Sequence, residues 1–455
     1  MRTAQTMTAA ASRRVIPGLL GVVAALLAST GCTLRSEMTL SPLALKPSDT
    51  VRAANRVEDL VEVGDYPRAL ALASAVDAKP NATVAELNAL GKAELVSGRL
   101  ADAKRHFRQA LVRKPFRDVY ADIAWNLSQA ELLDGEFAAS LHWAQTAVEY
   151  GLEIRSWHLE LLEALQTERP FVVGGVKDTE VPMEHRTPAI PRVEVRINEA
   201  RVMGIIDSGA VMTIVSDRLA AEAKLRSLGD FTGTFYGLLG EPIQVRFAMI
   251  DSMTIGDLVI ESVPVAIMAG EKMKFFTLNR TPFHIDLLLG ANLLREFRLS
   301  LDFERNEVSF HHLDASEKVP ATDQNLFILN AKPYVHGSLN GQGWFLYQLD
   351  TGSEITYLNS VEISRWKLQR NFAMMYRGAE LQGLGGATKR GVMVDDVSVG
   401  IGAWQGTFKT LPLYSSEKSG AIGLIGENFL KHFRLTIDFG TMKILLDPPS
   451  RKNEE

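Results

Sequence analysis

The chain has 455 residues, of which 46% are hydrophobic and 23% are charged, and its formal net charge is −5. This length predicts two to four domains, and the composition is that of a folded globular protein. A slightly acidic chain without a basic stripe lacks the electrostatic footprint of a nucleic-acid-binding protein, so we expect no nucleic-acid partner. The single cysteine excludes a disulfide framework, and none of the 9 histidines has a metal-ligand spacing, so we expect no metal and no other cofactor.

Residues 1–31 have the pattern of a secretory signal peptide. Arginines precede an apolar run over residues 15–28, which is too short to span a bilayer comfortably. Cys32 follows where a bacterial lipoprotein signal places its lipidated cysteine, and the segment resembles such a signal. Ser29 stands where that pattern usually has leucine, which leaves simple cleavage open as the alternative.

The resemblance to a lipoprotein signal implies a lipid anchor on Cys32 and attachment to a membrane surface. Thr33, directly after the cysteine, is similar to the residue found in lipoproteins that are sorted to the outer membrane. We therefore expect a periplasm-facing lipoprotein of the bacterial cell envelope. Residues 32–50 are polar and contain two prolines, which predicts a tether.

Residues 51–168 show helical patterning without any strand pattern. Glycine turns recur at Gly64, Gly98 and Gly135, and the first two are 34 residues apart, which is the usual period of a tetratricopeptide repeat. The segment around Gly98 resembles such a repeat most closely. The resemblance implies an all-α module of helical-hairpin repeats, with a possible protein partner on its surface.

From about residue 187 the pattern changes to alternating strands, and the remaining chain reads as two similar halves. We expect lobe 1 over residues 187–312, a polar linker over 313–326 and lobe 2 over 327–448. Each half has an apolar strand that runs into an Asp-Ser/Thr-Gly turn, a threonine six residues after the aspartate, and a later apolar-apolar-glycine segment. The matching residues are Asp207-Ser208-Gly209 with Asp350-Thr351-Gly352, Thr213 with Thr356, and Leu288-Leu289-Gly290 with Leu424-Ile425-Gly426.

These paired motifs resemble the aspartic peptidases, in particular their retropepsin-like branch. The resemblance covers more than half of the chain and implies a bilobal all-β domain behind the helical module. It further implies that Asp207 and Asp350 form the catalytic pair and that Ser208 and Thr351 brace the two loops. Gly209 and Gly352 would let backbone amides approach the carboxylates.

In members of this family, a hairpin flap also closes over the substrate. By resemblance, Tyr236 and Gly237 belong to the flap of lobe 1, and a glycine-rich segment belongs to the flap of lobe 2. The substrate-binding glycines expected in that second flap are Gly383, Gly385 and Gly386.

Two carboxylates that meet in a dry cleft can hydrolyse an amide without a metal. Like charges at close range cannot both ionise, so the pair shares one proton. One carboxylate activates a water while the other polarises the carbonyl. The sequence therefore predicts an aspartic endopeptidase acting on an envelope protein or peptide. The alternatives are a non-catalytic, peptide-binding scaffold lipoprotein with a degenerate protease fold, and a zymogen-like form in which residues 171–187 block the cleft.

Overall fold

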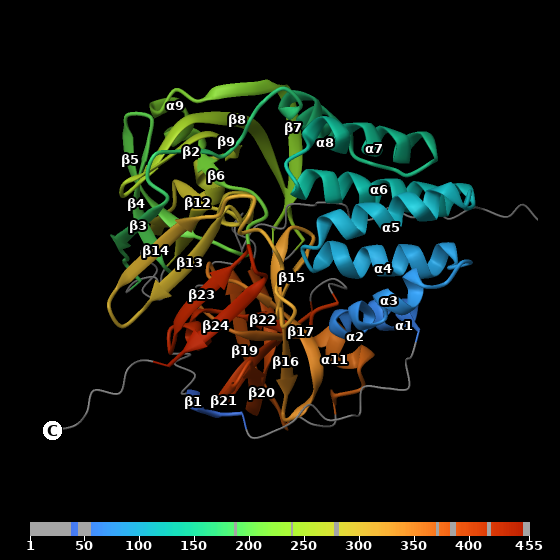
Figure 1. Cartoon of the computed structure of the whole chain (residues 1–455). Helices are drawn as coiled ribbons and strands as arrows, with labels where there is room; N and C mark the ends of the chain where they lie inside the picture. The colour runs from blue at the N-terminus through green and yellow to red at the C-terminus, as the bar shows by residue number, and fades with distance from the viewer. Residues whose placement is uncertain are drawn as a thin grey trace, which may run out of the picture.

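In a computed structural model of the chain, a layer of helices lies beside a larger β-rich region (Figure 1). The expected signal peptide, Cys32 and most of the expected tether lie outside the described residues. The structure describes residues 38–43, 56–185, 189–237, 240–276, 282–369, 373–382, 388–415 and 420–448.

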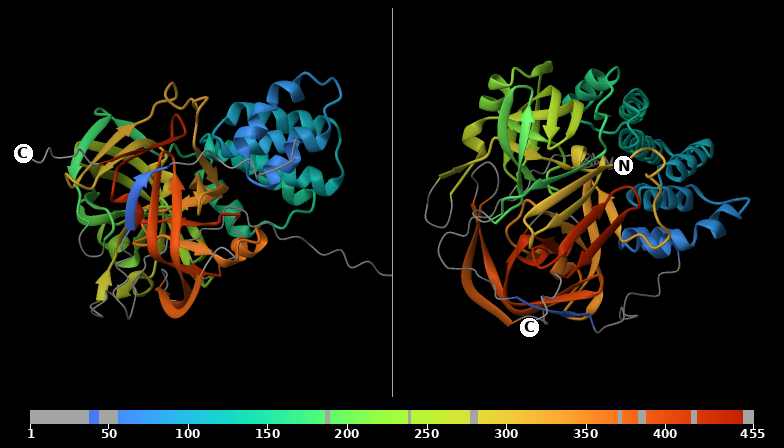
Figure 2. Two further views of the ribbon diagram at one scale, coloured as in Figure 1. Left: turned by 90° about the horizontal axis from the view of Figure 1, so that it is seen from below. Right: turned by 60° about the vertical axis from the view of Figure 1, so that its left-hand side comes forward.

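The helical layer consists of short helices that stack side by side along one flank of the molecule (Figures 1 and 2). Among the described residues these helices are α1 (Val57–Glu62), α2 (Tyr66–Ala71), α3 (Ala73–Asp77), α4 (Val84–Val96), α5 (Leu100–Val112), α6 (Arg117–Leu133), α7 (Phe137–Glu149) and α8 (Ser156–Leu165).

Glycines make the turns between successive helices. Gly64, Gly98 and Gly135 have φ angles of +78°, +72° and +79°, a left-handed conformation that favours glycine at a helix end. Within α4, a Cβ on Gly91 would lie 2.6 Å from the ring of Phe107 in α5, so the close approach of the two helices requires glycine there. The expected helical hairpins are therefore present, while their membership of the tetratricopeptide class stays a prediction.

The first half of the β-rich region, lobe 1, is built on an eight-stranded sheet in the order β2-β9-β6-β12-β5-β4-β8-β7. Its strands are β2 (Val172–Gly174), β4 (Arg192–Ile197), β5 (Ala200–Ile206), β6 (Ile214–Ser216), β7 (Arg226–Tyr236), β8 (Pro242–Ile255), β9 (Leu258–Met268) and β12 (Leu287–Leu289). Smaller elements of this half are α9 (Asp217–Glu222), the 3-10 helix η1 (Gly270–Met273), β10 (Lys274–Phe276), β11 (Pro282–His284) and α10 (Ala291–Leu294).

Lobe 2 repeats this order, strand for strand, as β1-β21-β18-β22-β17-β16-β20-β19, with β15 added beside β16. Its strands are β1 (Met38–Pro42), β15 (Leu326–Leu329), β16 (Lys332–Leu339), β17 (Gln342–Leu349), β18 (Tyr357–Asn359), β19 (Ala373–Gln382), β20 (Thr388–Ile401), β21 (Trp404–Tyr414) and β22 (Gly423–Ile425). Its helices are α11 (Ser360–Arg365) and α12 (Glu427–Leu430). The two halves are therefore structural copies of one unit, as the paired motifs predict.

A third sheet joins the lobes on the side away from the helical layer (Figure 1). Its order is β24-β23-β13-β14-β3, and its central pair is β13 of lobe 1 with β23 of lobe 2. The strands are β3 (Asp178–Pro182), β13 (Phe297–Asp302), β14 (Glu307–His312), β23 (Arg434–Asp438) and β24 (Lys443–Asp447). This sheet fixes the two lobes relative to each other.

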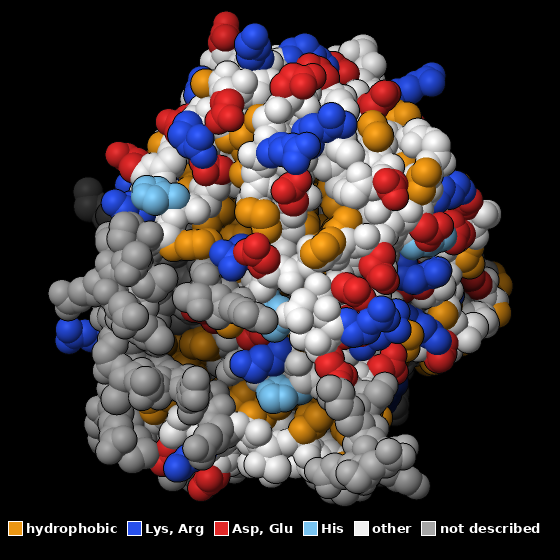
Figure 3. Space-filling model, turned by 90° about the vertical axis from the view of Figure 1, so that its left-hand side faces the viewer, with side chains coloured by type: hydrophobic (Ala, Val, Ile, Leu, Met, Phe, Trp, Pro, Cys, Tyr) orange, Lys and Arg blue, Asp and Glu red, His pale blue; other side chains and the backbone are white. Residues whose placement is uncertain are grey.

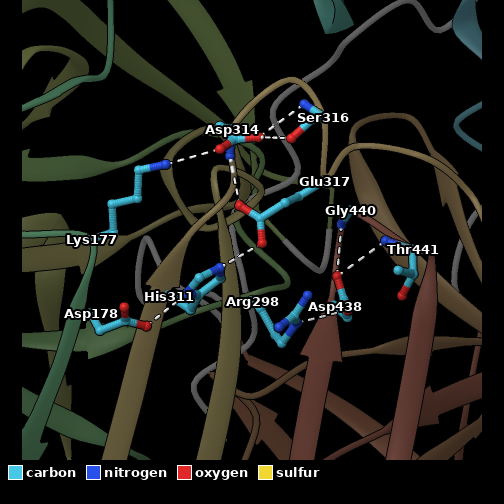
Figure 4. A network of polar contacts seen from close by, with 10 residues as sticks. All are labelled: Lys177, Asp178, Arg298, His311, Asp314, Ser316, Glu317, Asp438, Gly440 and Thr441. Carbon is cyan, nitrogen blue, oxygen red and sulfur yellow. Dashed lines mark hydrogen bonds and ion pairs between the residues drawn. The ribbon is translucent and has the colours of Figure 1, made fainter.

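Polar side chains reinforce this sheet (Figure 4). Asp438 accepts a hydrogen bond of 2.8 Å from Arg298 Nε across the β13–β23 pair and also binds the amides of its own turn. His311 lies between Glu317 and Asp178, at 2.7 and 2.6 Å, and its hydrogen bonds to these carboxylates raise its pKa. Asp438 is thus a structural residue of the joining sheet.

Two segments differ from the sequence expectations. Residues 172–174 and 178–182, which the zymogen-like alternative expects in the cleft, pair with β9 and β14 as strands of two sheets. Residues 38–42, expected in the tether, form β1 and pair antiparallel with β21 of lobe 2. The side chains of Met38 and Leu40 pack against the lobe core, which stabilises the strand.

The helical layer packs against both lobes. On lobe 1, the ring of Trp157 in α8 lies 5.9 Å from that of Phe235 and 5.6 Å from that of Phe247. On lobe 2, His336 Nε2 lies 2.8 Å from the carbonyl oxygen of Gly64. The helices therefore bridge the lobes on the flank opposite the joining sheet (Figures 1 and 2).

The face opposite the helical layer carries acidic and basic side chains interspersed with apolar ones (Figure 3). None of the helices formed by the described residues is both long enough and apolar enough to cross a membrane.

Candidate active site

Equivalent backbone positions hold the two aspartates. β5 ends at Ile206 and β17 ends at Leu349, so Asp207 and Asp350 each stand directly after a central strand. The amide of Asp207 donates to Leu289 O and the amide of Asp350 donates to Ile425 O, both at 3.0 Å. Each acceptor belongs to the short strand that runs parallel to the strand before the aspartate. This short strand therefore fixes the position of the loop that contains the aspartate.

In lobe 1 a threonine and an asparagine lock the Asp loop to the apolar-apolar-glycine segment. Asn292 Oδ1 accepts hydrogen bonds from the amide and the hydroxyl of Thr213, at 2.7 and 3.0 Å. The Thr213 hydroxyl in turn accepts from the amide of Gly290 at 3.1 Å. A Cβ on Gly290 would overlap the backbone of Met212, so the contact requires glycine.

Lobe 2 repeats this set of hydrogen bonds. Asn428 Oδ1 accepts from the amide of Thr356 at 2.7 Å, and the Thr356 hydroxyl accepts from the amide of Gly426 at 3.1 Å. A Cβ on Gly426 would overlap the carbonyl oxygen of Ile355. The sequence shows the threonines and glycines as paired positions, whereas the role of the asparagines emerges only from the structure.

A reciprocal set of hydrogen bonds joins the two Asp loops across the lobes. The Ser208 hydroxyl donates to Leu349 O at 3.0 Å and accepts from the Thr351 amide at 3.1 Å. The Thr351 hydroxyl donates to Ile206 O at 2.7 Å and accepts from the Ser208 amide at 3.1 Å. Because all these groups are buried, each would cost free energy if it lost its partner.

The loops bring the two carboxyl groups together. Asp207 Oδ1 accepts from the amides of Gly209 and Ala210, both at 3.0 Å, and Asp350 Oδ1 accepts from the amide of Gly352 at 2.9 Å. A Cβ on Gly209 would overlap the carboxyl group of Asp350, and one on Gly352 would overlap that of Asp207. Each carboxyl group therefore lies against the glycine of the opposite loop.

Both carboxyl groups are enclosed. Asp207 is 0% and Asp350 is 1% exposed, and their Oδ2 atoms are buried without a hydrogen-bond partner among the described residues. Burial raises the pKa of both groups, and the negative charge of Asp350 raises the pKa of Asp207 further. This is the environment in which two carboxyl groups share one proton.

Three side chains that the sequence did not single out surround the pair. Lys332 is 4% exposed; burial lowers its pKa to about 8, while the charges of Asp350 and Asp207 act in the opposite direction. Tyr334 and Tyr357 are also buried, and burial together with the charge of Asp350 raises the pKa of each phenol. The pair therefore has a cation and two neutral phenols beside it.

The expected flap of lobe 1 is a hairpin of β7 and β8, and Gly237 stands at its tip, where its amide donates to Glu241 O at 2.9 Å. Tyr236 reaches the helical layer: its hydroxyl accepts a 2.7 Å hydrogen bond from Arg155, whose guanidinium lies 4.7 Å from the ring centre. In lobe 2, β19 and β20 form the equivalent hairpin. Its tip, with Gly383, Gly385 and Gly386, lies outside the described residues.

The chain can also be compared with known protein families, curated proteins and solved structures. Residues 193–293 match the family model of the aspartyl proteases. The search of curated proteins returns no match. Among solved structures, the chain is similar to an aspartic proteinase from Irpex lacteus, with 13% identity over 61% of this chain and 99% of that chain and a TM-score of 0.38. It is also similar to a retropepsin-like aspartic protease from Rickettsia conorii, with 16% identity over 32% of this chain and 96% of that chain and a TM-score of 0.22.

The family match covers the part of lobe 1 that contains Asp207. Lobe 2 lies outside the match, but it repeats the strand order and the loop hydrogen bonds of lobe 1. At the level of the family, the match supports a hydrolase. No group of three or more His, Cys, Asp or Glu side chains that could hold a metal ion is found in the described part of the chain.

Proposed function

We propose that the chain is an aspartic endopeptidase that hydrolyses peptide bonds of an envelope protein or peptide, with Asp207 and Asp350 as the catalytic pair. The observation that carries this proposal is the reciprocal bonding of Ser208 and Thr351, which holds two carboxyl groups in one buried site. Ordinary turn aspartates would not need this bonding between the lobes.

The geometry supports different roles for the two carboxyl groups, one as a base and the other as an acid. In each, Oδ1 is held by backbone amides while Oδ2 is left for another partner. With one proton on the pair, the ionised carboxylate accepts a proton from a water as that water attacks the peptide carbonyl. The protonated carboxyl group donates to the carbonyl oxygen, and the pair then delivers a proton to the leaving nitrogen.

One chain supplies both loops, so the site is complete within a single copy. The buried carboxyl groups must become accessible before a polypeptide can bind, and the hairpin of β7 and β8 is the element we propose to open. We further propose that the helical layer binds a protein partner or presents the substrate. The reaction would take place at the bacterial cell envelope if Cys32 carries a lipid, which intact-mass measurement of the N-terminal peptide would test.

The decisive experiment uses the full chain and a randomised mixture of internally quenched decapeptides, followed by mass spectrometry of the products. We expect Asp207→Asn and Asp350→Asn each to reduce cleavage by at least about a thousandfold, because either change removes one half of the acid–base pair. Urea unfolding should show that both variants remain folded.

Asp302→Asn is the matched control, since this aspartate also ends a strand, and its hydrogen-bond partners among the described residues are the amides of Glu304 and Arg305 in its own turn. It should leave cleavage unchanged. If both variants of the pair cleave at the wild-type rate, the hydrolytic proposal is wrong. If no variant and no wild-type preparation cleaves any peptide but the wild type binds peptide, the scaffold alternative replaces it.

A further inference from the structure

The buried lysine beside the aspartate pair is a feature that hydrolysis by two carboxyl groups does not require. Lys332 begins β16 and is 4% exposed, although a buried ammonium is costly unless a negative charge compensates it. The charged groups that act on it are Asp350 and Asp207. The structure thus places one cation with two acids in a single enclosed site.

Continued strand register relates the position of Lys332 to that of Asp350. β16 and β17 are antiparallel, and Tyr334 is paired with Gln348. Continuing this register by two residues places Lys332 directly opposite Asp350. Side chains at directly opposed positions have Cβ atoms about 4.5–5.5 Å apart on the same face of the sheet. The ammonium and the carboxyl group therefore share one face.

Two local features fix this register. The pairing shifts between Gly337 and Leu339, and because of this bulge the continued register places Asp350, and not Leu349, opposite Lys332. On its other side, Lys332 follows a two-residue turn in which Asn330 and Ala331 have φ angles of +49° and +60°. An alanine in this left-handed conformation is strained, and such strain persists where the surroundings dictate it.

Lobe 1 has no charge at the equivalent place. Arg192 is paired with Ile205, so continuing that register by two residues places Ile190 opposite Asp207. The hydrogen bond from the Ile206 amide to the Pro191 carbonyl shows that the pairing extends in this direction. Ile190 is fully buried and apolar. The cation is therefore a specific addition to lobe 2 and no general requirement of the fold.

We propose that Lys332 is a positioning residue of the catalytic pair, whose positive charge keeps one carboxyl group ionised and so extends the working range of the enzyme toward lower pH. A singly protonated pair carries one negative charge, and with the ammonium the enclosed site is neutral overall. Without the ammonium, the same site would hold an uncompensated buried anion, and the pair would retain both protons to a higher pH. The inference rests on the proposed function of Asp207 and Asp350.

The other titratable groups facing the pair do not supply this charge. Tyr334 comes from β16 and Tyr357 from the end of the loop after Asp350, and both phenols are neutral because their pKa values are raised. Burial raises the pKa of Asp207 and of Asp350, and the charge of Lys332 lowers both. Among the described groups acting on the pair, Lys332 is thus the one that brings a positive charge.

The test is a carboxyl titration of the full chain, labelled with ¹³C-aspartate and followed by NMR between about pH 3 and pH 9. The resonances of the pair are those lost in Asp207→Asn and Asp350→Asn. We expect Lys332→Met to raise the lower apparent pKa of the pair by about 1–3 units, the shift typical of losing an adjacent opposite charge. Lys332→Arg, which keeps the charge, should restore the wild-type value to within about 0.5 unit.

Lys92→Met is the matched control, because burial lowers the pKa of this lysine too, while its charged neighbour is Asp122 in the helical layer. It should leave the titration of the pair unchanged. Lys332→Gln replaces Lys332→Met if the latter does not fold. An unchanged lower pKa in the neutral variants would overturn the proposal.

Cleavage assays separate this inference from the proposed function. If the chain cleaves peptides, the acidic limb of the kcat/KM profile should move upward in Lys332→Met by the same amount as the titration, and an unmoved limb would contradict the inference. If neither protein cleaves, the proposed function fails, while the titration still decides whether Lys332 controls the ionisation of the pair.

Discussion

Lobe 1 and lobe 2 repeat the same strand order and the same hydrogen bonds around their aspartates. The side chains next to those hydrogen bonds differ in polarity. Lobe 1 has apolar residues at three equivalent positions where lobe 2 has ionisable ones. The pairs are Ile190 with Lys332, Val211 with Glu354, and Ala291 with Glu427. The backbone scaffold is the same in both halves, whereas the ionisable side chains at these positions belong to lobe 2.

This difference separates the positioning of the two aspartates from the control of their ionisation. The bonds of Ser208 and Thr351 are reciprocal, so positioning is shared equally by the lobes. Electrostatic control is unequal, because lobe 2 alone supplies the buried lysine whose charge acts on both aspartates. Substitutions in the shared scaffold and in the unequal surroundings should therefore behave differently.

The largest expected effect concerns the shared scaffold. Ser208→Ala and Thr351→Val should each lower the free energy of unfolding by about 2–4 kcal/mol, because each leaves a buried amide and a buried carbonyl of the other lobe without a partner. Urea unfolding followed by tryptophan fluorescence measures this. If the scaffold is truly shared, the two losses should agree within about 1 kcal/mol, and the double variant should lose less than their sum.

Ser300→Ala is the control for this prediction, since its hydroxyl contacts that of Thr436 at 3.2 Å between the same lobes but away from the aspartates. Its cost should stay below about 1 kcal/mol. A clearly larger loss for one loop than for the other would show that a single lobe organises the junction.

The second prediction tests the unequal surroundings through Glu427. Both of its carboxylate oxygens are buried without a hydrogen bond among the described residues, and burial raises its pKa from 4.5 to about 7. The native state thus holds this proton up to about pH 7, whereas the unfolded chain releases it near pH 4.5. Between these values the unfolded state binds fewer protons, so stability falls as pH rises.

Glu427→Gln should remove this pH-dependent loss of stability, because glutamine does not ionise. The variant should be more stable than wild type by up to about 3 kcal/mol at pH 8, and the advantage should vanish near pH 4. Thermal unfolding between about pH 4 and pH 8 measures the stability difference between the variant and the wild type. Glu222→Gln on the exposed surface is the control. A variant that is less stable at pH 8 would indicate that the ion pair with Lys431, at 3.8 Å, outweighs the cost of burial.

The smallest expected effect concerns the hairpin of lobe 1, which the helical layer holds through Arg155. Tyr236→Phe removes the 2.7 Å hydrogen bond from Arg155 but keeps the ring. Losing about 1 kcal/mol should make amide exchange in β7 and β8 roughly fivefold faster, as measured by hydrogen-exchange mass spectrometry. Tyr150→Phe, elsewhere in the layer, should not change exchange in this hairpin. Equal exchange in wild type and Tyr236→Phe would mean that Arg155 does not restrain the hairpin.

Much of this site could be predicted from local sequence because its parts depend on residues with a fixed local role. Glycines at helix ends and at close approaches mark the turns, and the Asn340-Gly341 turn between β16 and β17 has the left-handed angles that this dipeptide favours. The paired Asp-Ser/Thr-Gly segments then follow from duplication. These local signals predict the helical hairpins and the two-lobed β region.

Other parts depend on pairings that local sequence does not specify. Lys332 reads as an ordinary residue at the start of a strand, and a hairpin without the bulge near Gly337 would place it opposite Leu349 instead of Asp350. Likewise, residues 38–42 find their partner in β21, more than three hundred residues further along the chain. Polar composition alone therefore predicted a tether.

That first strand also limits the distance between lobe 2 and any lipid that Cys32 carries. Met38 is fixed at the edge of lobe 2, opposite Phe408, and it lies six residues after Cys32. Six residues span at most about 21 Å even when fully extended. If Cys32 is acylated, lobe 2 would be held close to the lipid headgroups, and the polypeptides within reach would be those that emerge from, or lie along, the same bilayer surface.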